Sequence, residues 1–213
     1  MGGAMFMSRS STAAAKLKIH ALTPERWPDL EKLFGPRGAC GGCWCMWFRL
    51  KRSEFIKQKG PGNRRAFRRI VCSGEEPGLL AYAGAEPVGW CAVAPRECYP
   101  VLARSRVLKP IDDRRVWSVV CFFVARGFRR RGVTTALLKA AATHSRDKGA
   151  TVLEGYPVIA RKGGMPDAFA YTGLPSAFIR AGFVEVARRS PTRPIMRLEL
   201  KKDARRRGRA AVK

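Results

Sequence analysis

Residues 119–141 read VVCFFVARGFRRRGVTTALLKAA, and this stretch decides the fold. Its apolar run predicts a buried strand, and the glycine and arginine residues that follow predict a loop. Apolar residues then recur at helical spacing, which predicts an amphipathic helix that stops near Lys148 and Gly149. Because loop amides, the helix dipole and arginine side chains all favour negative charge, we expect a pyrophosphate site at this junction.

Three kinds of phosphate site can be compared with the loop. The spacing from Gly127 to Gly132 mimics a P-loop, but Val133 stands where a P-loop needs Lys. A dinucleotide fold would place G-x-G-x-x-G near the start of a βαβ unit, and that motif is absent here. The third comparison is with the six residues Arg129, Arg130, Arg131, Gly132, Val133 and Thr134. They resemble the R/Q-x-x-G-x-G/A signature of the GNAT superfamily of N-acetyltransferases, which holds the pyrophosphate of acetyl-CoA.

The match has one departure, because Thr134 replaces the usual final Gly or Ala. Taken alone, the six residues are also compatible with a solvated basic turn before an ordinary helix. The order of the surrounding elements favours the family resemblance.

That order is read from apolar periodicity and from Gly and Pro punctuation. It consists of a strand (16–22), a helix (24–35), one or two short helices in SEFIKQK and NRRAFRRIVCSG, a hairpin (78–94), a strand (115–125), the loop and helix, a strand (151–158), the helix LPSAFIRAGF, the strand FVEVARR and a last strand (194–200). The order resembles that of a GNAT domain, as does the ending SAFIRAGFVEV, in which a helix delivers a G-F pair into a late strand. The resemblance covers residues 16–200. It implies one α/β domain with a central mixed, mostly antiparallel sheet flanked by helices.

Length and composition agree with one soluble domain. The chain has 213 residues, of which 46% are hydrophobic, enough for one substantial core. The longest apolar run, residues 116–125, is too short to span a membrane, and no secretory signal is visible, so we expect a cytoplasmic protein. Residues 1–15 are predicted to be a disordered extension and residues 201–213 a disordered basic tail.

The formal net charge of +26 far exceeds what the phosphates of acetyl-CoA require. Such a surplus predicts affinity for polyanions. Two interpretations remain open: a solvated basic surface with nonspecific RNA affinity, or an acceptor amine carried on nucleic acid or on a nucleic-acid-bound protein.

Seven cysteines are present, three of them close together at Cys40, Cys43 and Cys45. A structural zinc site usually has four ligands in two pairs, and no second pair is visible, so we expect no metal. The adjoining residues Trp44, Met46, Trp47 and Phe48 fall where the superfamily builds its acceptor pocket. The resemblance implies that they line this pocket, although a hydrophobic plug of the core is an equal alternative.

In this superfamily, the pantetheine arm of acetyl-CoA pairs with the backbone of the strand before the loop. The resemblance therefore places Phe122, Phe123 and Val124 along the arm. A backbone amide there would polarise the thioester carbonyl, and residues 129–134 would hold the pyrophosphate. Acetyl-CoA is the implied co-substrate.

Candidate acid and base residues are less well marked. Many members of the superfamily carry a Tyr four residues before the late Gly, but here that position is Phe178, which has no proton to donate. Tyr171 and Tyr156 are the nearby substitutes. Glu154 is the first choice for a general base, since burial in its apolar strand would raise its pKa. A paired structural carboxylate is the alternative for Glu154.

These observations predict an acetyl-CoA-dependent N-acetyltransferase that acts on a primary amine, most simply that of a small molecule. Two other functions stay open. One is a transferase for a tRNA-borne or protein amine, and the other is a catalytically idle module that binds CoA or nucleic acid.

Overall fold

The computed structural model describes residues 17–160 and 164–201, which form one seven-stranded sheet with helices packed on it. The predicted extension at 1–15 and nearly all of the predicted tail at 201–213 lie outside these residues. The strands are β1 (Leu17–Ala21), β2 (Gly78–Ala83), β3 (Glu86–Pro95), β4 (Trp117–Val124), β5 (Val152–Gly155), β6 (Val184–Arg188) and β7 (Pro194–Glu199). Each coincides with a strand predicted from the sequence.

The sheet order is β1-β2-β3-β4-β5-β7-β6. Only β4 and β5 pair in parallel, and the other neighbours are antiparallel. A mixed, mostly antiparallel sheet flanked by helices was the predicted fold class, and the structure confirms it. The parallel pair is joined through the long helix after β4, as a parallel connection requires.

The described helices are α1 (Trp27–Phe34), α2 (Arg52–Lys57), α3 (Pro61–Cys72), α4 (Pro100–Arg104), α5 (Val133–Asp147) and α6 (Pro175–Arg180). Five of them were predicted from the sequence. Helix α4 was missed, because five residues are too few to show a helical period. Lys148 ends α5 and Gly149 follows with φ near +90°, so the predicted stop is confirmed.

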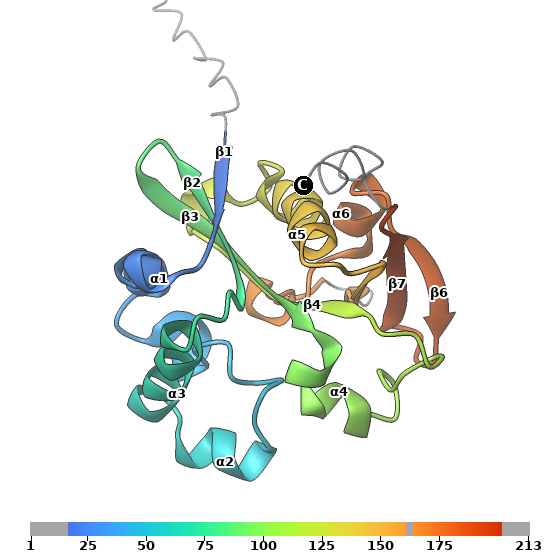
Figure 1. Ribbon diagram of the computed structural model, residues 1–213, viewed down its shortest axis with the longest axis horizontal. Coiled ribbons are helices and arrows are strands. Elements are labelled where there is room, and N and C mark those ends of the chain that lie inside the picture. The colour runs from blue at the N-terminus through green and yellow to red at the C-terminus, as the bar shows by residue number, and fades with distance from the viewer. Residues whose placement is uncertain (1–16, 161–163, 202–213) are drawn as a thin grey trace, which may run out of the picture.

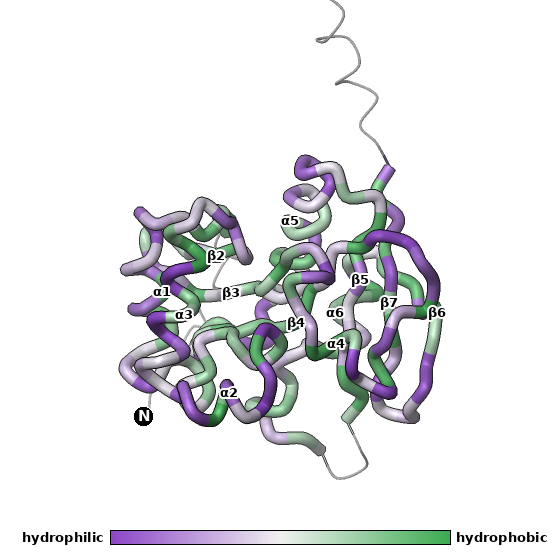
Figure 2. Tube along the Cα trace, turned by 60° about the horizontal axis from the view of Figure 1, so that its bottom comes forward, coloured by the Kyte–Doolittle hydropathy of each residue, from purple (hydrophilic) through white to green (hydrophobic). Residues whose placement is uncertain are grey.

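The helices form two layers, one on each face of the sheet (Figure 1). Helices α1 and α3 pack on one face over a core that includes Leu30, Phe67 and Trp90. Helices α5 and α6 cover the other face over a core that includes Leu137 and Phe178. Hydrophobic colour runs along β2 and β4, whereas α1, α2 and α3 carry hydrophilic stretches (Figure 2). Within the described part of the chain, no helix combines the length and the apolar character that crossing a membrane would require.

Strands β4 and β5 separate in the middle of the sheet. They pair only from Trp117 to Val119, where Val119 lies opposite Gly155, the last residue of β5. Strand β4 then continues for five more residues while it stays paired with β3. A β-bulge in β4 at Val120 falls where the separation begins. Bulges bend a strand and increase its twist, so the two strands diverge into a V.

The side chain of Phe178 fills the base of this V on the α6 side. It is fully buried and makes edge-to-face contacts with Phe122 and Phe183, at 6.1 and 5.1 Å between ring centroids. The ring lies against two glycines: a Cβ on Gly155 would come within 2.2 Å of it, and one on Gly173 within 2.9 Å. An aromatic ring at this position therefore requires glycine on both sides.

We expect Gly155→Ala to lower the free energy of unfolding by about 1–3 kcal/mol, because the added methyl group overpacks the site around Phe178. Urea denaturation measures this loss. Phe178→Leu in the same chain should recover part of it. Gly127→Ala is the matched control, since a Cβ at Gly127 meets nothing within 4 Å, and it should stay within about 0.5 kcal/mol. Equal effects of the two alanine substitutions would contradict the packing argument.

Candidate functional site

A cleft of about 1260 Å³ opens where β4 leaves β5. One end is formed by the last residues of β4, the following loop, the start of α5 and part of α6. The other end is formed by the segment from Ala39 to Lys59, and the segment from Met165 to Leu174 closes one side. Pockets for one small ligand are typically about 300–1,000 Å³. The cleft therefore has room for two ligands end to end.

The loop after β4 forms a cradle of backbone amides at the start of α5. A 3-10 turn at Arg126–Phe128 is followed by Arg130 and Gly132, whose φ angles are +60° and +78°. Helix α5 starts at Val133 without a side-chain cap, and its first helical bond runs from Ala136 N–H to Gly132 C=O at 3.0 Å. The amides before Ala136 therefore lack helical acceptors and, with the helix dipole, favour an anion.

Two further observations show that the cradle has room. A Cβ built on Gly132 meets nothing within 4 Å, so the space above the loop is open. The hydroxyl oxygen of Thr135 is buried and has no hydrogen-bond partner among the described residues, although Thr135 lines the cleft. Buried polar atoms are normally satisfied, so this hydroxyl is available to a ligand. The sequence motif ends one residue before Thr135, which is why it was missed.

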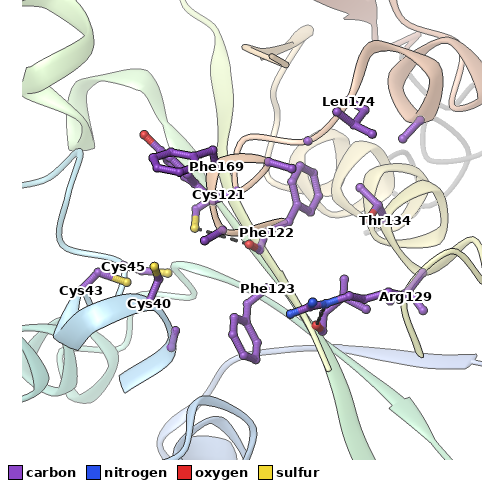
Figure 3. Close-up of a pocket in the computed structure, with 18 of the residues that line it drawn as sticks. Cys40, Cys43, Cys45, Cys121, Phe122, Phe123, Arg129, Thr134, Phe169 and Leu174 are labelled. Atoms are coloured by element: carbon purple, nitrogen blue, oxygen red, sulfur yellow. Dashed lines mark hydrogen bonds between the residues drawn. The ribbon is translucent and has the colours of Figure 1, made fainter. Parts of the chain in front are cut away.

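Eight of the nine residues predicted to bind the cofactor line the cleft: Phe122, Phe123, Val124, Arg129, Arg130, Gly132, Val133 and Thr134. The exception is Arg131, whose guanidinium lies 5.7 Å from the centre of the Phe128 ring. Arg129 donates from Nε to the carbonyl oxygen of Val124 at 3.2 Å, which ties the loop to the strand. Figure 3 shows Arg129 and Thr134 together on one side of the cleft.

The β4 edge is partly occupied by the protein itself. The amide of Phe122 donates to the carbonyl oxygen of Tyr171 at 2.6 Å. The segment containing Tyr171 thus lies beside β4 at a point that β5 no longer reaches. A pantetheine arm that used the Phe122 amide would have to displace Tyr171. This contact could not be predicted from local sequence patterns, because it joins residues 49 positions apart.

Of the four residues predicted to line the acceptor pocket, Trp47 and Phe48 line the cleft. The structure places Trp44 and Met46 away from the cleft, in the core, to which the equally buried Phe48 also contributes. Trp44 stacks on Trp27 at 5.9 Å between ring centroids. The alternative of a hydrophobic plug therefore holds for half of the stretch.

A turn at Trp44 and Cys45 explains why Trp44 lies in the core while Trp47 lines the cleft. Trp44 and Cys45 have φ angles of +42° and +56°, which reverse the chain and send neighbouring side chains to different sides. The turn is also tightly packed, since a Cβ on Gly38 would come within 2.0 Å of the Trp44 ring. A left-handed conformation at two bulky residues is rare and could not be read from the sequence.

Cysteines are among the residues lining the cleft that the sequence did not predict. Cys40, Cys43, Cys45 and Cys121 all line it, and all are free thiols. Figure 3 shows the first three gathered at the end opposite Arg129, with Cys121 on β4 between them. Burial raises the pKa of Cys43 to about 11 and that of Cys45 well above its usual value, so both are neutral thiols. Among the described residues, no group of three or more His, Cys, Asp or Glu side chains is arranged to hold a metal ion.

Glu154 was predicted to be a general base, but the structure places it in a buried ion-pair network instead. It is 1% exposed and does not line the cleft. One carboxylate oxygen accepts from Arg96 at 2.5 Å and from the Tyr156 hydroxyl at 2.6 Å. The other oxygen accepts from Arg197 Nε at 2.7 Å. Both oxygens are occupied, so Glu154 is the paired structural carboxylate of the alternative interpretation.

Tyr156, one of the two predicted acids, belongs to the same network and likewise does not reach the cleft. Its side chain is fully buried, and its hydroxyl also contacts Arg96 and, at 2.9 Å, the Ser118 hydroxyl. Burial raises the pKa of Tyr156, with the Glu154 carboxylate adding to the effect. The position of Tyr156 just after β5, on the closed side of the V, explains why it cannot reach a ligand.

Tyr171 is the predicted acid that does reach the cleft. The centroid of its ring lies 6.4 Å from that of Phe48. Tyr171 therefore borders the end of the cleft formed by residues 39–59, which we name the acceptor end after its predicted role. Burial raises the pKa of its phenol, and the nearby Arg193 guanidinium opposes the rise. The hydroxyl therefore stays protonated at neutral pH and can act as a proton donor.

Positive charge is concentrated beside the acceptor end. Between residues 49 and 72 the chain carries nine Lys and Arg residues and one acidic residue, Glu54. Four exposed arginines follow one another on α3, at Arg64, Arg65, Arg68 and Arg69. Arg64 forms an ion pair with Glu31 at 2.5 Å. The polyanion affinity expected from the net charge stays a prediction.

The chain was then compared with known proteins. The family model described as Acetyltransferase (GNAT) family matches residues 44–157, more than half of the chain. No curated protein matches it in sequence. Among solved structures, it is similar to an N-acetyltransferase from Staphylococcus aureus Mu50, with 11% identity and a TM-score of 0.51 over 87% of this chain and 99% of that chain.

Two further structures have the same fold. A GNAT-family acetyltransferase from Listeria monocytogenes 4b F2365 has 9% identity and a TM-score of 0.51 over 86% of this chain and 95% of that chain. A protein assigned to the GNAT family from Desulfovibrio desulfuricans has 16% identity and a TM-score of 0.50 over 87% and 99%. At such identities these structures establish the fold alone, and the family model establishes the family. With its V-shaped sheet, its basic loop and this match, the chain belongs to the GNAT family of acetyltransferases.

Proposed function

We propose that the protein is an acetyl-CoA-dependent N-acetyltransferase that transfers the acetyl group to a primary amine. One observation carries this proposal: a single cleft joins the phosphate cradle at Arg129–Thr134 to an apolar chamber around Trp47 and Phe48. The diverging edge of β4 runs between the two ends. A ligand with an anionic end and a long neutral arm would place its anionic end in the cradle and its arm along β4. Acetyl-CoA has this form.

The residues of the cradle fit the pyrophosphate. The open space above Gly132 lets the backbone approach it, and the first amides of α5 with Arg129 and Arg130 supply donors and charge. The Thr135 hydroxyl adds one unpaired buried donor. Arg180 on α6 also lines this end and adds a second cationic wall. These groups would anchor the co-substrate and leave its thioester near the Tyr171 end of β4.

Acetyl transfer to an amine forms a C–N bond and breaks the C–S bond of the thioester, with the amine losing one proton. A thioester supplies an activated acyl group, so the protein has mainly to position the two reactants and exclude water. The apolar walls of the acceptor end serve both purposes. Tyr171 would give a proton to the departing thiolate, since its phenol is protonated at neutral pH and its segment lies beside β4 in the cleft.

We expect acetyl-CoA to raise the melting temperature of the full chain, while ATP and NAD at equal concentration leave it nearly unchanged. Differential scanning fluorimetry measures the shifts. Gly132→Glu should abolish the shift, because the new side chain fills the cradle with a negative charge, while the unliganded variant stays folded. Equal shifts from all three ligands would mean nonspecific anion binding and would overturn the assignment of the cradle.

Removing the Tyr171 hydroxyl should lower kcat on the order of 10²-fold, the low end for general acid catalysis. Tyr171→Phe keeps the ring and the backbone carbonyl that accepts from Phe122, so packing is preserved. Steady-state assays at pH 7 and circular dichroism check activity and folding. Tyr156→Phe is the matched control: it should lower stability through its buried network and leave kcat within about threefold. A loss of kcat in Tyr156→Phe alone would reverse the assignment.

Glu154→Gln tests whether Glu154 is a structural carboxylate or a general base. It removes the negative charge that faces Arg96 and Arg197, so we expect a loss of about 3–5 kcal/mol in the free energy of unfolding. The shape of the pH dependence of kcat/KM should not change in the folded fraction. Retained stability together with loss of the basic limb of the pH profile would restore Glu154 as the base.

A further inference from the structure

The acceptor end of the cleft differs chemically from the cradle end. Its walls are aromatic rings and thiols, chiefly Trp47, Phe48, Phe55, Cys43 and Cys121. Trp47 and Phe55 meet edge to face at 5.1 Å between ring centroids, which leaves a firm aromatic surface. A wall of this kind binds flat apolar groups and offers few hydrogen-bond partners to a polar chain.

Within the described lining of this end, carboxylate and imidazole groups that could accept a proton are absent. Among the described residues that line the cleft, none is Asp, Glu or His. The titratable and charged groups that do line it are Cys40, Cys43, Cys45, Cys121, Tyr171, Lys59, Arg129, Arg130 and Arg180. Cys43 and Cys45 are neutral thiols, and the Tyr171 phenol holds its proton. Glu154, the carboxylate that the sequence suggested, is bound on both oxygens inside the core.

This composition opposes a protonated acceptor. An alkylamine with a pKa near that of Lys is unprotonated at pH 7 in only roughly one molecule in 10³. Its ammonium form would find no carboxylate in the described lining, and the charged side chain at this end, Lys59, is itself cationic. An aromatic amine is neutral at pH 7, because its lone pair is delocalised into the ring, and it needs no base before attack.

We propose that the acceptor is an aromatic amine, whose ring lies against Trp47 and Phe48 and whose amino group points toward the end of β4 near Cys121. This inference rests on the proposed function. In the reaction, the neutral amine attacks the thioester carbon, the C–S bond breaks, and Tyr171 protonates the departing thiolate. The proton of the new ammonium centre then returns to the Tyr171 phenolate through solvent. The balance needs no oxidant, reductant or metal.

The test uses the full chain with acetyl-CoA and three amines: aniline, benzylamine and cyclohexylamine. Product formation is followed by chromatography, since reagents that detect free CoA thiol would also react with the cysteines of the protein. At pH 7 we expect kcat/KM for aniline to exceed that for benzylamine and cyclohexylamine by at least about tenfold. Between pH 6 and 9 the aniline value should stay flat, whereas the benzylamine value should rise about tenfold per pH unit, as its neutral fraction does.

Variants locate the acceptor and check for a base. Trp47→Leu should raise KM for aniline about tenfold through loss of the ring contact. Trp117→Leu is the matched control, because Trp117 is also half-buried but does not line the cleft, and its KM should not change. Asp167 belongs to the 3-10 turn Asp167–Phe169 beside the cleft, so Asp167→Asn is made as well. It should leave the pH profile for benzylamine unchanged.

The outcomes separate this inference from the proposed function. Acetylation of benzylamine or cyclohexylamine at pH 7 as fast as that of aniline would overturn the inference and leave the N-acetyltransferase standing. The same holds if Asp167→Asn abolishes turnover of benzylamine, which would identify a base. If acetyl-CoA does not stabilise the protein and no amine is acetylated, the proposed function itself fails.

Discussion

The separation of β4 from β5 is the constraint on which the rest of the structure depends. Pairing stops at Val119 and Gly155, and a bulge at Val120 bends β4 away while its other edge remains paired with β3. An open strand edge inside a sheet exposes unpaired backbone groups, which must find other partners. The Tyr171 carbonyl satisfies one of them. The cleft, the cradle and the acceptor end all border this edge.

The closed end of the V is held by charge. Glu154 on β5 accepts from Arg197 on the neighbouring strand β7 and from Arg96, which follows β3 on the far side of β4. Arg197 continues to Asp112 at 2.5 Å, and Arg96 donates to the Leu108 carbonyl at 2.6 Å, which fixes the long connection before β4. Buried pairs contribute modestly to net stability but are costly to break on one side. The network therefore links β5, β7 and the connection before β4 at the closed end of the V.

The two ends of the cleft differ in charge and polarity. Arg129, Arg130 and the start of α5 make one end cationic, whereas the thiols and rings around Trp47 make the other neutral. Acyl transfer from a thioester to an already neutral amine needs positioning more than proton transfer. The described lining of the cleft contains no carboxylate, which agrees with a reaction that depends mainly on positioning. The loop at 38–45, with left-handed residues such as Trp44 and Cys45, gives the neutral end its shape.

The sequence by itself determined the strand–loop–helix at 119–141, the order of strands and helices, and the family. These features depend on local periodicity and on residues adjacent in the chain, such as Arg129 to Thr134, so they can be read without knowing any long-range contact. Tertiary structure decided the rest of the site. It assigned Glu154 and Tyr156 to a buried network, because their partners Arg96 and Arg197 are about forty to sixty positions away in the chain. The tertiary structure also places Trp44 in the core and Trp47 in the cleft. The cause is a reversal of the chain at Trp44 and Cys45, whose left-handed conformations cannot be read from sequence periodicity.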